Sequence, residues 1–230
     1  MIRSAMILAA GRGERMRPLT DSIPKPLIPV AGRSMLERTM DRLQRSGVQN
    51  VVVNVHHLGN QIAERIGGRA RIVREDRLLE TGGSVRNALP LLGNAPFFVL
   101  NGDGLWRDGP ESMLGRLAAM WDPNRMDALL LLHPLAKTIG REEKDRGDYY
   151  LEPDGRARHR GSAETAPYLF ASISVCDPRL FTGSPEGPFS LLKLWTRSEQ
   201  AGRLYGLVHD GDWFHVGTTA ALADAERVLG

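Results

Sequence analysis

Short apolar segments that alternate with amphipathic stretches constrain the fold of this chain more than any other feature. Within residues 1–135 these segments are apolar throughout, and the stretches between them repeat apolar residues at helical spacing. Strands that are buried on both faces are typical of a parallel sheet covered by helices on both sides. The sequence therefore predicts an α/β fold with a doubly wound, mostly parallel, Rossmann-like sheet. We expect strands at 4–9, 48–55, 70–74, 96–101 and 128–133, and helices at 34–46, 58–66, 84–92 and 112–121.

The second half of the chain begins with a change of character at Pro134. Residues 134–167 are polar and rich in Arg, Asp, Glu and Gly, and they contain a predicted hairpin with its turn at 153–155. Strands at 148–151, 168–175 and 204–208 and helices at 190–200 and 218–229 are expected. We interpret 1–230 as a single domain in which a small mixed insertion, carried on the sheet, selects the substrate.

Composition narrows the functional class. The net charge is +3 and the pI is about 9.3, but the basic residues are dispersed and no basic run alternates with aromatics, so we expect no nucleic-acid partner. No segment approaches the roughly 20 apolar residues of a membrane span, so we expect no membrane partner. The apolar start of the chain is interrupted at residues 11–15, unlike a secretory signal, and Cys176 is the single cysteine. We therefore expect a cytoplasmic protein.

The most informative motif is the loop that follows the first predicted strand. Gly11 and Gly13 match the start of a dinucleotide-binding fingerprint, but Met16 stands where a third glycine belongs. The second strand also ends in Asn54, where that fingerprint needs an acidic residue. No Gly-Lys-Ser/Thr follows at Walker A spacing. The loop either cradles phosphate with its backbone amides or is only a tight connection.

Cationic side chains near this loop favour phosphate binding. Arg12, Arg15 and Arg17 lie in the loop, and Lys25 stands between two prolines that restrict its backbone. A lysine held in this way is suited to aim its ammonium at a phosphate. Together with the glycine amides, Arg15 and Lys25 would hold a triphosphate.

Residues 6–32, MILAAGRGERMRPLTDSIPKPLIPVAG, closely resemble the signature of the sugar-phosphate nucleotidyltransferases. That family has a Gly-x-Gly-x-Arg-Met/Leu-x-Pro-Leu-Thr run followed by Pro-Lys-Pro-Leu at this spacing. The resemblance implies a GT-A-type fold and transfer of a nucleoside monophosphate from an NTP to a sugar 1-phosphate, with release of pyrophosphate. It implies a nucleotide-binding part at about 1–135 and a sugar-phosphate part at about 136–230. By the same resemblance, Arg15 and Lys25 act on the phosphates, and the nucleotide-binding loop residues are Leu8, Ala10, Gly11 and Gly13.

The segment Leu79-Glu80-Thr81-Gly82-Gly83 fits the family segment that packs on the nucleotide base, which makes Glu80, Gly82 and Gly83 nucleotide-binding candidates. Glycines would let backbone amides approach a planar ring, although a turn that starts a helix has the same composition. The segment is most similar to that of short bacterial uridylyltransferases that act on N-acetylmuramic acid 1-phosphate in cell-wall recycling. The alternatives are GMP or dTMP transfer to the 1-phosphate of mannose, heptose or glucose, and a non-catalytic regulatory subunit that binds a nucleotide sugar.

Asn101-Gly102-Asp103 ends the fourth predicted strand, where the family places a metal-binding aspartate, and the resemblance assigns Asn101 to the nucleotide. A carboxylate suits Mg²⁺. The family's second ligand is usually an Asp in a Trp-x-Asp-Val-Gly-Thr run, but His215 stands at that position here. We hypothesise that Asp103 and His215 hold Mg²⁺, with Mn²⁺ as a substitute that imidazole suits better. The alternative is a His215 that only hydrogen-bonds phosphate or water.

Two residues are candidates for binding the sugar phosphate. Asp148 lies in Arg146-Gly147-Asp148-Tyr149, which resembles a Gly-Asp-Phe/Tyr element of the muramic-acid enzymes. Lys193 would take the place of a Glu-Lys-Pro lysine that longer family members have and this chain lacks. Each residue has the alternative of being an ordinary surface or loop residue. We expect an NTP and a sugar 1-phosphate as partners, and the sequence leaves the oligomeric state open.

Overall fold

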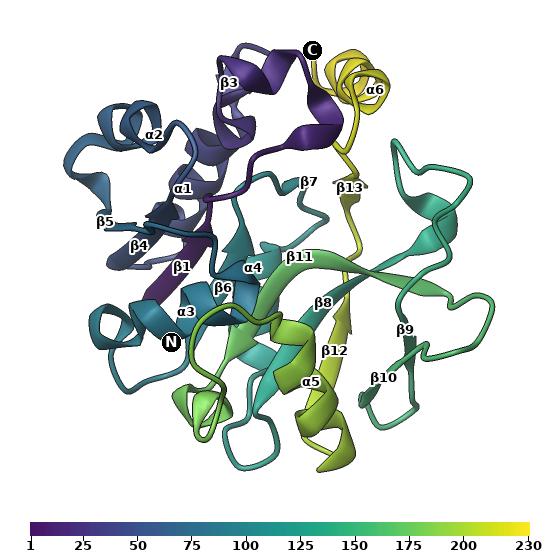
Figure 1. Ribbon diagram of the computed structural model, residues 1–230. Helices are drawn as coiled ribbons and strands as arrows, with labels where there is room; N and C mark the ends of the chain where they lie inside the picture. The colour runs from purple at the N-terminus through teal and green to yellow at the C-terminus, as the bar shows by residue number, and fades with distance from the viewer.

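A mixed nine-stranded sheet forms the centre of the computed structural model, which describes residues 1–230 (Figure 1). Its strands are β1 (Ser4–Leu8), β4 (Asn50–Val55), β5 (Arg71–Arg74), β6 (Phe97–Asn101), β8 (Ala128–Pro134), β9 (Tyr149–Leu151), β10 (Ala157–His159), β11 (Tyr168–Cys176) and β12 (Leu204–Val208). β5, β4, β1 and β6 run parallel in that order. β11 lies antiparallel between β6 and β8, so that β8 and β12 run in the direction of the first four strands.

Helices cover both faces of this sheet, as the sequence predicts (Figure 1). Ala5 and Ile7 of β1 belong to a hydrophobic cluster with α1, α2 and α4, whereas Met6 between them belongs to a second cluster with α3 and α5. The strand alternates its side chains between two covered faces, and this explains why it is apolar throughout. The helices are α1 (Met35–Arg45), α2 (Gly59–Ile66), α3 (Glu80–Leu92), α4 (Met113–Met120), α5 (Leu191–Gln200) and α6 (Thr219–Leu229).

The predicted elements agree closely with the structure. Each predicted strand is present, with ends that differ by at most two residues, and the doubly wound α/β fold is confirmed. α1 begins where expected because Ser34 and Glu37 form a reciprocal capping box. The largest shift is in α3, which begins at Glu80 rather than at residue 84, so that Thr81, Gly82 and Gly83 lie in its first turn.

β11 changes its pairing partner along its length. Its final residues, from Ile173 to Cys176, pair with β6, while Tyr168 at its start pairs with β9 of the β9–β10 hairpin. Against β8, the register shifts between Phe170 and Ser174. Such a bulge bends a strand and increases its twist. The start of β11 and the insertion therefore leave β6 at the point where β6 ends.

A small separate sheet carries the C-terminal segment to the same end of β6. β7 (Leu105–Arg107) pairs antiparallel with β13 (Asp212–Phe214), and His215 directly follows β13. A third hydrophobic cluster, which includes Met16, Phe214 and Ala225, holds α6 against the N-terminal loop and the β2–β3 hairpin (Pro29–Val30 and Arg33–Ser34). None of the helices combines the length and the apolar character that a bilayer span requires.

Candidate active site

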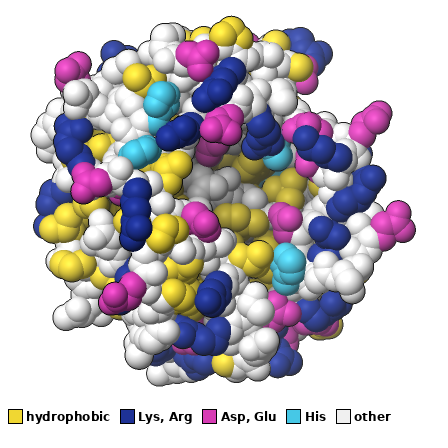
Figure 2. Space-filling view, in the orientation of Figure 1, with side chains coloured by type: hydrophobic (Ala, Val, Ile, Leu, Met, Phe, Trp, Pro, Cys, Tyr) yellow, Lys and Arg dark blue, Asp and Glu magenta, His cyan; other side chains and the backbone are white.

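Two cavities meet at the carboxyl ends of the parallel strands. One has a volume of about 620 Å³ and the other about 270 Å³, and both are lined by Arg15, Lys25, Asn101 and Asp103. Figure 2 shows a hollow at the centre of this face, with charged and histidine side chains around it. Open α/β sheets bind ligands at this end of their strands. The four shared residues therefore lie where two bound molecules would meet.

The larger cavity is formed around the glycine loop. Gly13 has a φ of 65°, and a Cβ there would lie 2.9 Å from Thr20 Cγ2 and 3.1 Å from Lys25 Cβ, so only glycine fits without strain. Thr20 Oγ1 donates to the Gly13 carbonyl at 2.9 Å, which closes the loop on itself. Leu8, Ala10, Gly11 and Arg15 line the cavity together with Gly13. The predicted loop residues thus lie together along one wall.

Lys25 and Asp103 make an ion pair between the two cavities. Lys25 begins a single 3₁₀ turn after Pro24, and its Nζ donates to Asp103 Oδ2. The lysine side chain is only 12% exposed and the aspartate side chain 33%, so bulk water screens the pair incompletely. The ammonium and the carboxylate, 78 residues apart in sequence, therefore face any ligand in either cavity.

A buried polar network supports the floor of the larger cavity, and sequence reasoning missed it. Asn54 is 2% exposed and Glu75 is 6% exposed. Asn54 Nδ2 donates to Glu75 Oε1 at 2.8 Å and to Ser84 Oγ at 3.0 Å, and Asn54 Oδ1 accepts from the Ala9 amide at 2.9 Å. Glu75 Oε2 also accepts from the Leu79 amide. This network holds the start of the glycine loop against α3.

The structure corrects the expected role of Gly82 and Gly83. Neither lines either of the two cavities, and their amides donate to the Phe189 carbonyl at 2.8 and 3.1 Å, so these amides are not free for a base. A Cβ at Gly82 would collide with the Phe189 ring, and one at Gly83 would collide with the Gly187 carbonyl. The glycines allow α3 to pack closely on the segment before α5. Glu80 lines the larger cavity, and its contact with a nucleotide stays a prediction.

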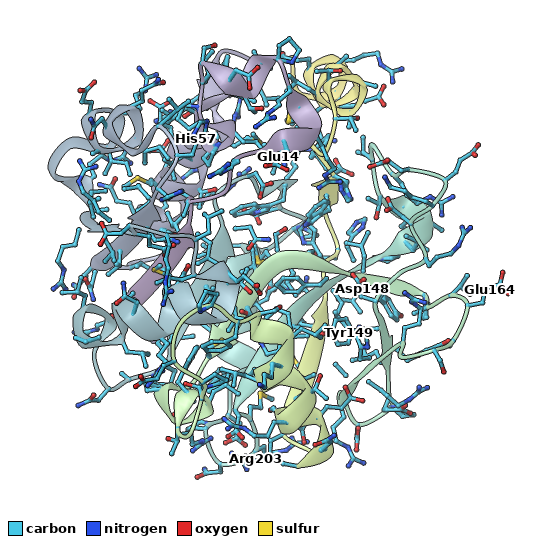
Figure 3. The ribbon with its side chains drawn as sticks, in the orientation of Figure 1. Glu14, His57, Asp148, Tyr149, Glu164 and Arg203 are labelled. Atoms are coloured by element: carbon cyan, nitrogen blue, oxygen red, sulfur yellow. The ribbon has the colours of Figure 1, made fainter.

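The smaller cavity is formed by the insertion, β11 and the segment after β13. Asp148 Oδ2 accepts from the Phe170 amide at 2.9 Å, and the Asp148 carbonyl accepts from the Arg160 amide. Arg160 Nε donates in turn to the Gly147 carbonyl. Figure 3 shows Glu14, which lines the larger cavity, on the N-terminal loop, and Asp148, which lines the smaller one, beside the start of β11. The insertion loop is therefore held in one position, with Asp148 directed at the cavity.

Lys193 lies outside both cavities, contrary to its predicted place at the sugar phosphate. It is exposed in the first turn of α5, where its backbone amide bonds the Ser190 carbonyl. The helix presents Leu191, Leu194 and Trp195 to the core, which turns position 193 outward. The structure does not bring Lys193 into the candidate site.

His215 lies in the smaller cavity among charged side chains. Its Nδ1 is 3.8 Å from Asp145 Oδ2, and Arg15 Nη1 is 3.5 Å from Glu142 Oε1. A hydrogen bond from Lys144, with the charges of Arg15 and His215, holds the pKa of Glu142 below its usual value. His215 is thus placed beside carboxylates and within the same cavity as Asp103.

The residues present fit a divalent cation that substrates help to hold. Asp103 Oδ1 has no hydrogen-bond partner, and the chain has no cluster of three or more metal-ligating side chains. Mg²⁺ is commonly bound by one or two carboxylates with phosphate oxygens and waters, so a denser cluster is not required. Asp103 and His215 together offer one carboxylate and one imidazole to the space between the cavities.

Comparisons with known proteins agree with this geometry. Residues 4–127 match the family model described as Nucleotidyl transferase. The chain is 40% identical to the N-acetylmuramate alpha-1-phosphate uridylyltransferase of Caulobacter vibrioides, over 98% of this chain and 96% of that one. It is 36% identical to the enzyme of the same name from Neisseria meningitidis, over 98% of each. The solved structure of HddC from Yersinia pseudotuberculosis, complexed with GMP-PN, has a TM-score of 0.79 at 18% identity and covers 100% of both chains.

Proposed function

The chain belongs to the nucleotidyl transferase family, and from that premise we propose that it joins UTP to N-acetylmuramic acid 1-phosphate and releases pyrophosphate. The resemblance noted in residues 6–32 is confirmed by the family match and by two uridylyltransferases similar over nearly the whole chain. The observation that carries the proposal is the junction of two cavities at Lys25 and Asp103. It suits a reaction between two phosphate-bearing substrates.

The size and lining of each cavity support the assignment of substrates. The larger one, about 620 Å³, has the glycine loop and Arg15, which suit a nucleoside triphosphate. We assign the nucleotide to it and to residues 1–135, and the sugar phosphate to the smaller cavity and to residues 136–230. The α-phosphate would then lie beside Lys25.

The chemistry requires positioning more than proton transfer. A phosphate oxygen of the sugar 1-phosphate is already anionic at neutral pH, so it attacks the α-phosphorus in line without a general base. Lys25 would neutralise charge on the reacting phosphates, and Arg15 would bind the departing pyrophosphate. Both side chains line both cavities, which places their charge at the junction.

A third cation supports an acidic sugar as the acceptor. Arg146 lines the smaller cavity in addition to Arg15 and Lys25. N-acetylmuramic acid has a lactyl carboxylate besides its phosphate, and a guanidinium pairs well with a carboxylate. Asp148 Oδ1 has no hydrogen-bond partner, because only Oδ2 is bonded to Phe170, so it can accept from a sugar hydroxyl or amide. An acidic sugar would therefore meet both a cation and an acceptor.

We assign a divalent cation, Mg²⁺ or Mn²⁺, to Asp103 and His215. When bound, the cation would supply positive charge to the phosphates and fix their orientation. Asp145, 3.8 Å from His215 Nδ1, would favour the orientation of the ring that leaves Nε2 available. We further propose that the reaction recycles peptidoglycan sugars, because the two similar uridylyltransferases are named for N-acetylmuramate, and that it occurs in the cytoplasm.

Pyrophosphate release tests this proposal. Each of ATP, CTP, GTP, UTP and dTTP is paired with a panel of sugar 1-phosphates that includes N-acetylmuramic acid 1-phosphate, in Mg²⁺ and then in Mn²⁺. We expect release only with UTP and the muramic-acid substrate. Asp103→Ala, with its fold checked by circular dichroism, should lose at least about 100-fold in turnover because a preorganised charge is removed.

The other outcomes separate the alternatives. Release with GTP or dTTP and another sugar would keep the mechanism and discard the substrates. No release across the whole panel in either metal would favour a non-catalytic subunit that binds a nucleotide sugar. Near-normal turnover of Asp103→Ala would refute the role given to that carboxylate.

A further inference from the structure

Ser172 has a backbone conformation that its position in a strand does not explain. Its φ is 59°, although it lies inside β11. Three other residues with a side chain have positive φ, and each lies at a turn or at the start of a helix: Ala31 in the β2–β3 turn, Leu58 at the N-cap of α2 and Glu80 at the first residue of α3. Glu80 also lines the larger cavity, whereas Ser172 is the one of the four that lies inside a strand. Such conformations are strained for L-residues, and they concentrate at functional sites.

Ser172 faces the smaller cavity from the bulged part of β11. Ala171 and Ile173 on either side are buried in the core, at 0% and 1% exposure, while Ser172 is half-buried and lines the smaller cavity with Lys25 and Asp103. Ala171 and Ile173 belong to one hydrophobic cluster with Leu169 and Val175, so strand alternation places Ser172 on the opposite face. A small adjoining cavity of about 190 Å³, between β11 and α5, is also lined by Ser172.

The hydrogen bonds of Ser172 leave it ready to donate. Asn101 Nδ2 donates to Ser172 Oγ at 3.3 Å, and the hydroxyl donates to no atom of the protein. A hydroxyl that already accepts one hydrogen bond still has its own proton available. The bond from Asn101 occupies one lone pair of the hydroxyl, so the proton points away from that amide. Because Ser172 lines the smaller cavity, its hydroxyl can donate to a ligand bound there.

We propose that Ser172 binds the sugar 1-phosphate by donating its hydroxyl proton to an oxygen of that substrate. The proposal rests on the assignment of the sugar phosphate to the smaller cavity. Ser172 does not line the larger cavity, so the contact is specific to the acceptor and not to the nucleotide. Glycine at position 172 would adopt this φ without steric strain. What serine has there and glycine lacks is the hydroxyl group that the proposal uses.

Three variants test the contact. Ser172→Gly removes the hydroxyl and the strain, Ser172→Ala removes the hydroxyl alone, and Ala31→Gly relieves a positive φ away from both cavities. Loss of one hydrogen bond to an anionic substrate should raise the KM for the sugar 1-phosphate about tenfold in both Ser172 variants. The KM for the NTP should not change, and Ala31→Gly should keep both wild-type KM values.

Thermal melting separates this contact from a structural role. Ser172→Gly should melt no lower than the wild type and above Ser172→Ala, because relief of strain offsets the added freedom of the unfolded chain. Addition of the sugar 1-phosphate should then raise the melting temperature of both Ser172 variants less than that of the wild type. The same experiment with inorganic phosphate locates the contact within the substrate. If inorganic phosphate also raises the melting temperature of the variants less than that of the wild type, Ser172 contacts the phosphate. If it raises both equally, Ser172 contacts the sugar.

The proposal is overturned if both Ser172 variants keep the wild-type KM for the sugar 1-phosphate, or if the KM for the NTP rises equally. An inactive wild-type protein across the whole substrate panel is a different result, because it contradicts the proposed function itself. The melting experiment with the sugar 1-phosphate needs no turnover, so it tests Ser172 in either case.

Discussion

Replacing Asn54 with aspartate should make the stability of this protein strongly dependent on pH. Asn54→Asp changes little in volume, but it exchanges the amide that donates to Glu75 Oε1 at 2.8 Å for a carboxylate oxygen. The two carboxyls would then face each other where residues 54 and 75 are 2% and 6% exposed. The Ala9 amide would keep its acceptor at position 54, and the Ser84 hydroxyl, which accepts from Asn54 Nδ2 in the wild type, can turn to donate to the new carboxylate.

The size of the effect follows from this distance. Two full charges about 2.8 Å apart at an effective dielectric constant of about 20 repel by roughly 6 kcal/mol. The pair can avoid this repulsion if one of the two carboxyls stays protonated. Keeping a carboxyl protonated lowers the free energy of unfolding by about 1.4 kcal/mol for each pH unit above about 4, or about 4 kcal/mol at pH 7. Retaining a proton requires less free energy than the repulsion of two charges, so we expect the free energy of unfolding to fall by about 4 kcal/mol at pH 7. That is a large fraction of the usual stability of a domain, about 5–15 kcal/mol.

The sign of the pH dependence is fixed by which state binds the proton. The folded variant holds a proton that its unfolded chain releases, so its stability falls as pH rises, by about 1.4 kcal/mol per unit, and it recovers toward pH 4. Urea unfolding, followed by circular dichroism at half-unit steps from pH 5 to 8, measures the difference from the wild type.

The matched control is Asn54→Asp combined with Glu75→Gln. This double variant exchanges the carboxylate and the amide, so a donor again faces an acceptor across the 2.8 Å contact. We expect most of the stability to return and the slope to match that of the wild type. A single variant whose stability difference stays constant from pH 5 to 8 would refute the reasoning.

Three further predictions concern metal choice, sugar choice and acid stability. His215→Asp should raise activity in Mg²⁺ relative to Mn²⁺ in pyrophosphate assays at limiting metal, because a carboxylate suits Mg²⁺ better than imidazole does. Arg146→Gln should weaken the binding of N-acetylmuramic acid 1-phosphate by about 10- to 100-fold, through loss of a charged pair, and barely change the binding of N-acetylglucosamine 1-phosphate, both measured from ligand-induced shifts in melting temperature. Burial, and for His133 also the charge of His209, lowers the pKa of both these histidines. Their folded state resists protonation, so stability should fall as pH drops below about 6.5, and His209→Gln should flatten that fall in urea unfolding.

Each of these predictions has a result that would contradict it. An unchanged ratio of Mg²⁺ to Mn²⁺ activity would leave His215 without a role at the metal. If Arg146→Gln weakens the binding of both sugar 1-phosphates equally, Arg146 does not recognise the lactyl carboxylate. A His209→Gln variant with the wild-type slope between pH 5 and 6.5 would mean that this histidine does not resist protonation in the folded state.

Local sequence patterns predicted the secondary structure because its causes are local. The apolar run at β1 and the capping residue Ser34 act within a few neighbours, and these elements lie where expected. Gly82 and Gly83 show the limit of such reasoning. Their small size is required by Phe189 and Gly187, more than 100 residues away, so the sequence suggested approach to a base where the structure has helix packing.

In the candidate site, too, local motifs could be predicted from the sequence, while contacts between distant residues could not. Gly13, Lys25 and Asp103 belong to motifs with fixed spacing, and the structure brings them together as expected. Asn54 was noted in the sequence only as a departure from a dinucleotide fingerprint. Its buried position at the end of a strand was a usable signal, but its partners at Ala9, Glu75 and Ser84 are 21 to 45 residues away. Nothing in the sequence near Ser172 signals its positive φ.

The division of the two cavity linings along the chain has a consequence for how such a protein can diversify. Apart from the four shared residues, the smaller cavity is lined only by residues from Leu135 onward, and the larger one by residues up to Ser84 and Gly217. The residues that line only the smaller cavity come from two segments, 135–172 and 213–216. Substitutions within these two segments can therefore alter the acceptor side while the residues that line only the larger cavity stay the same.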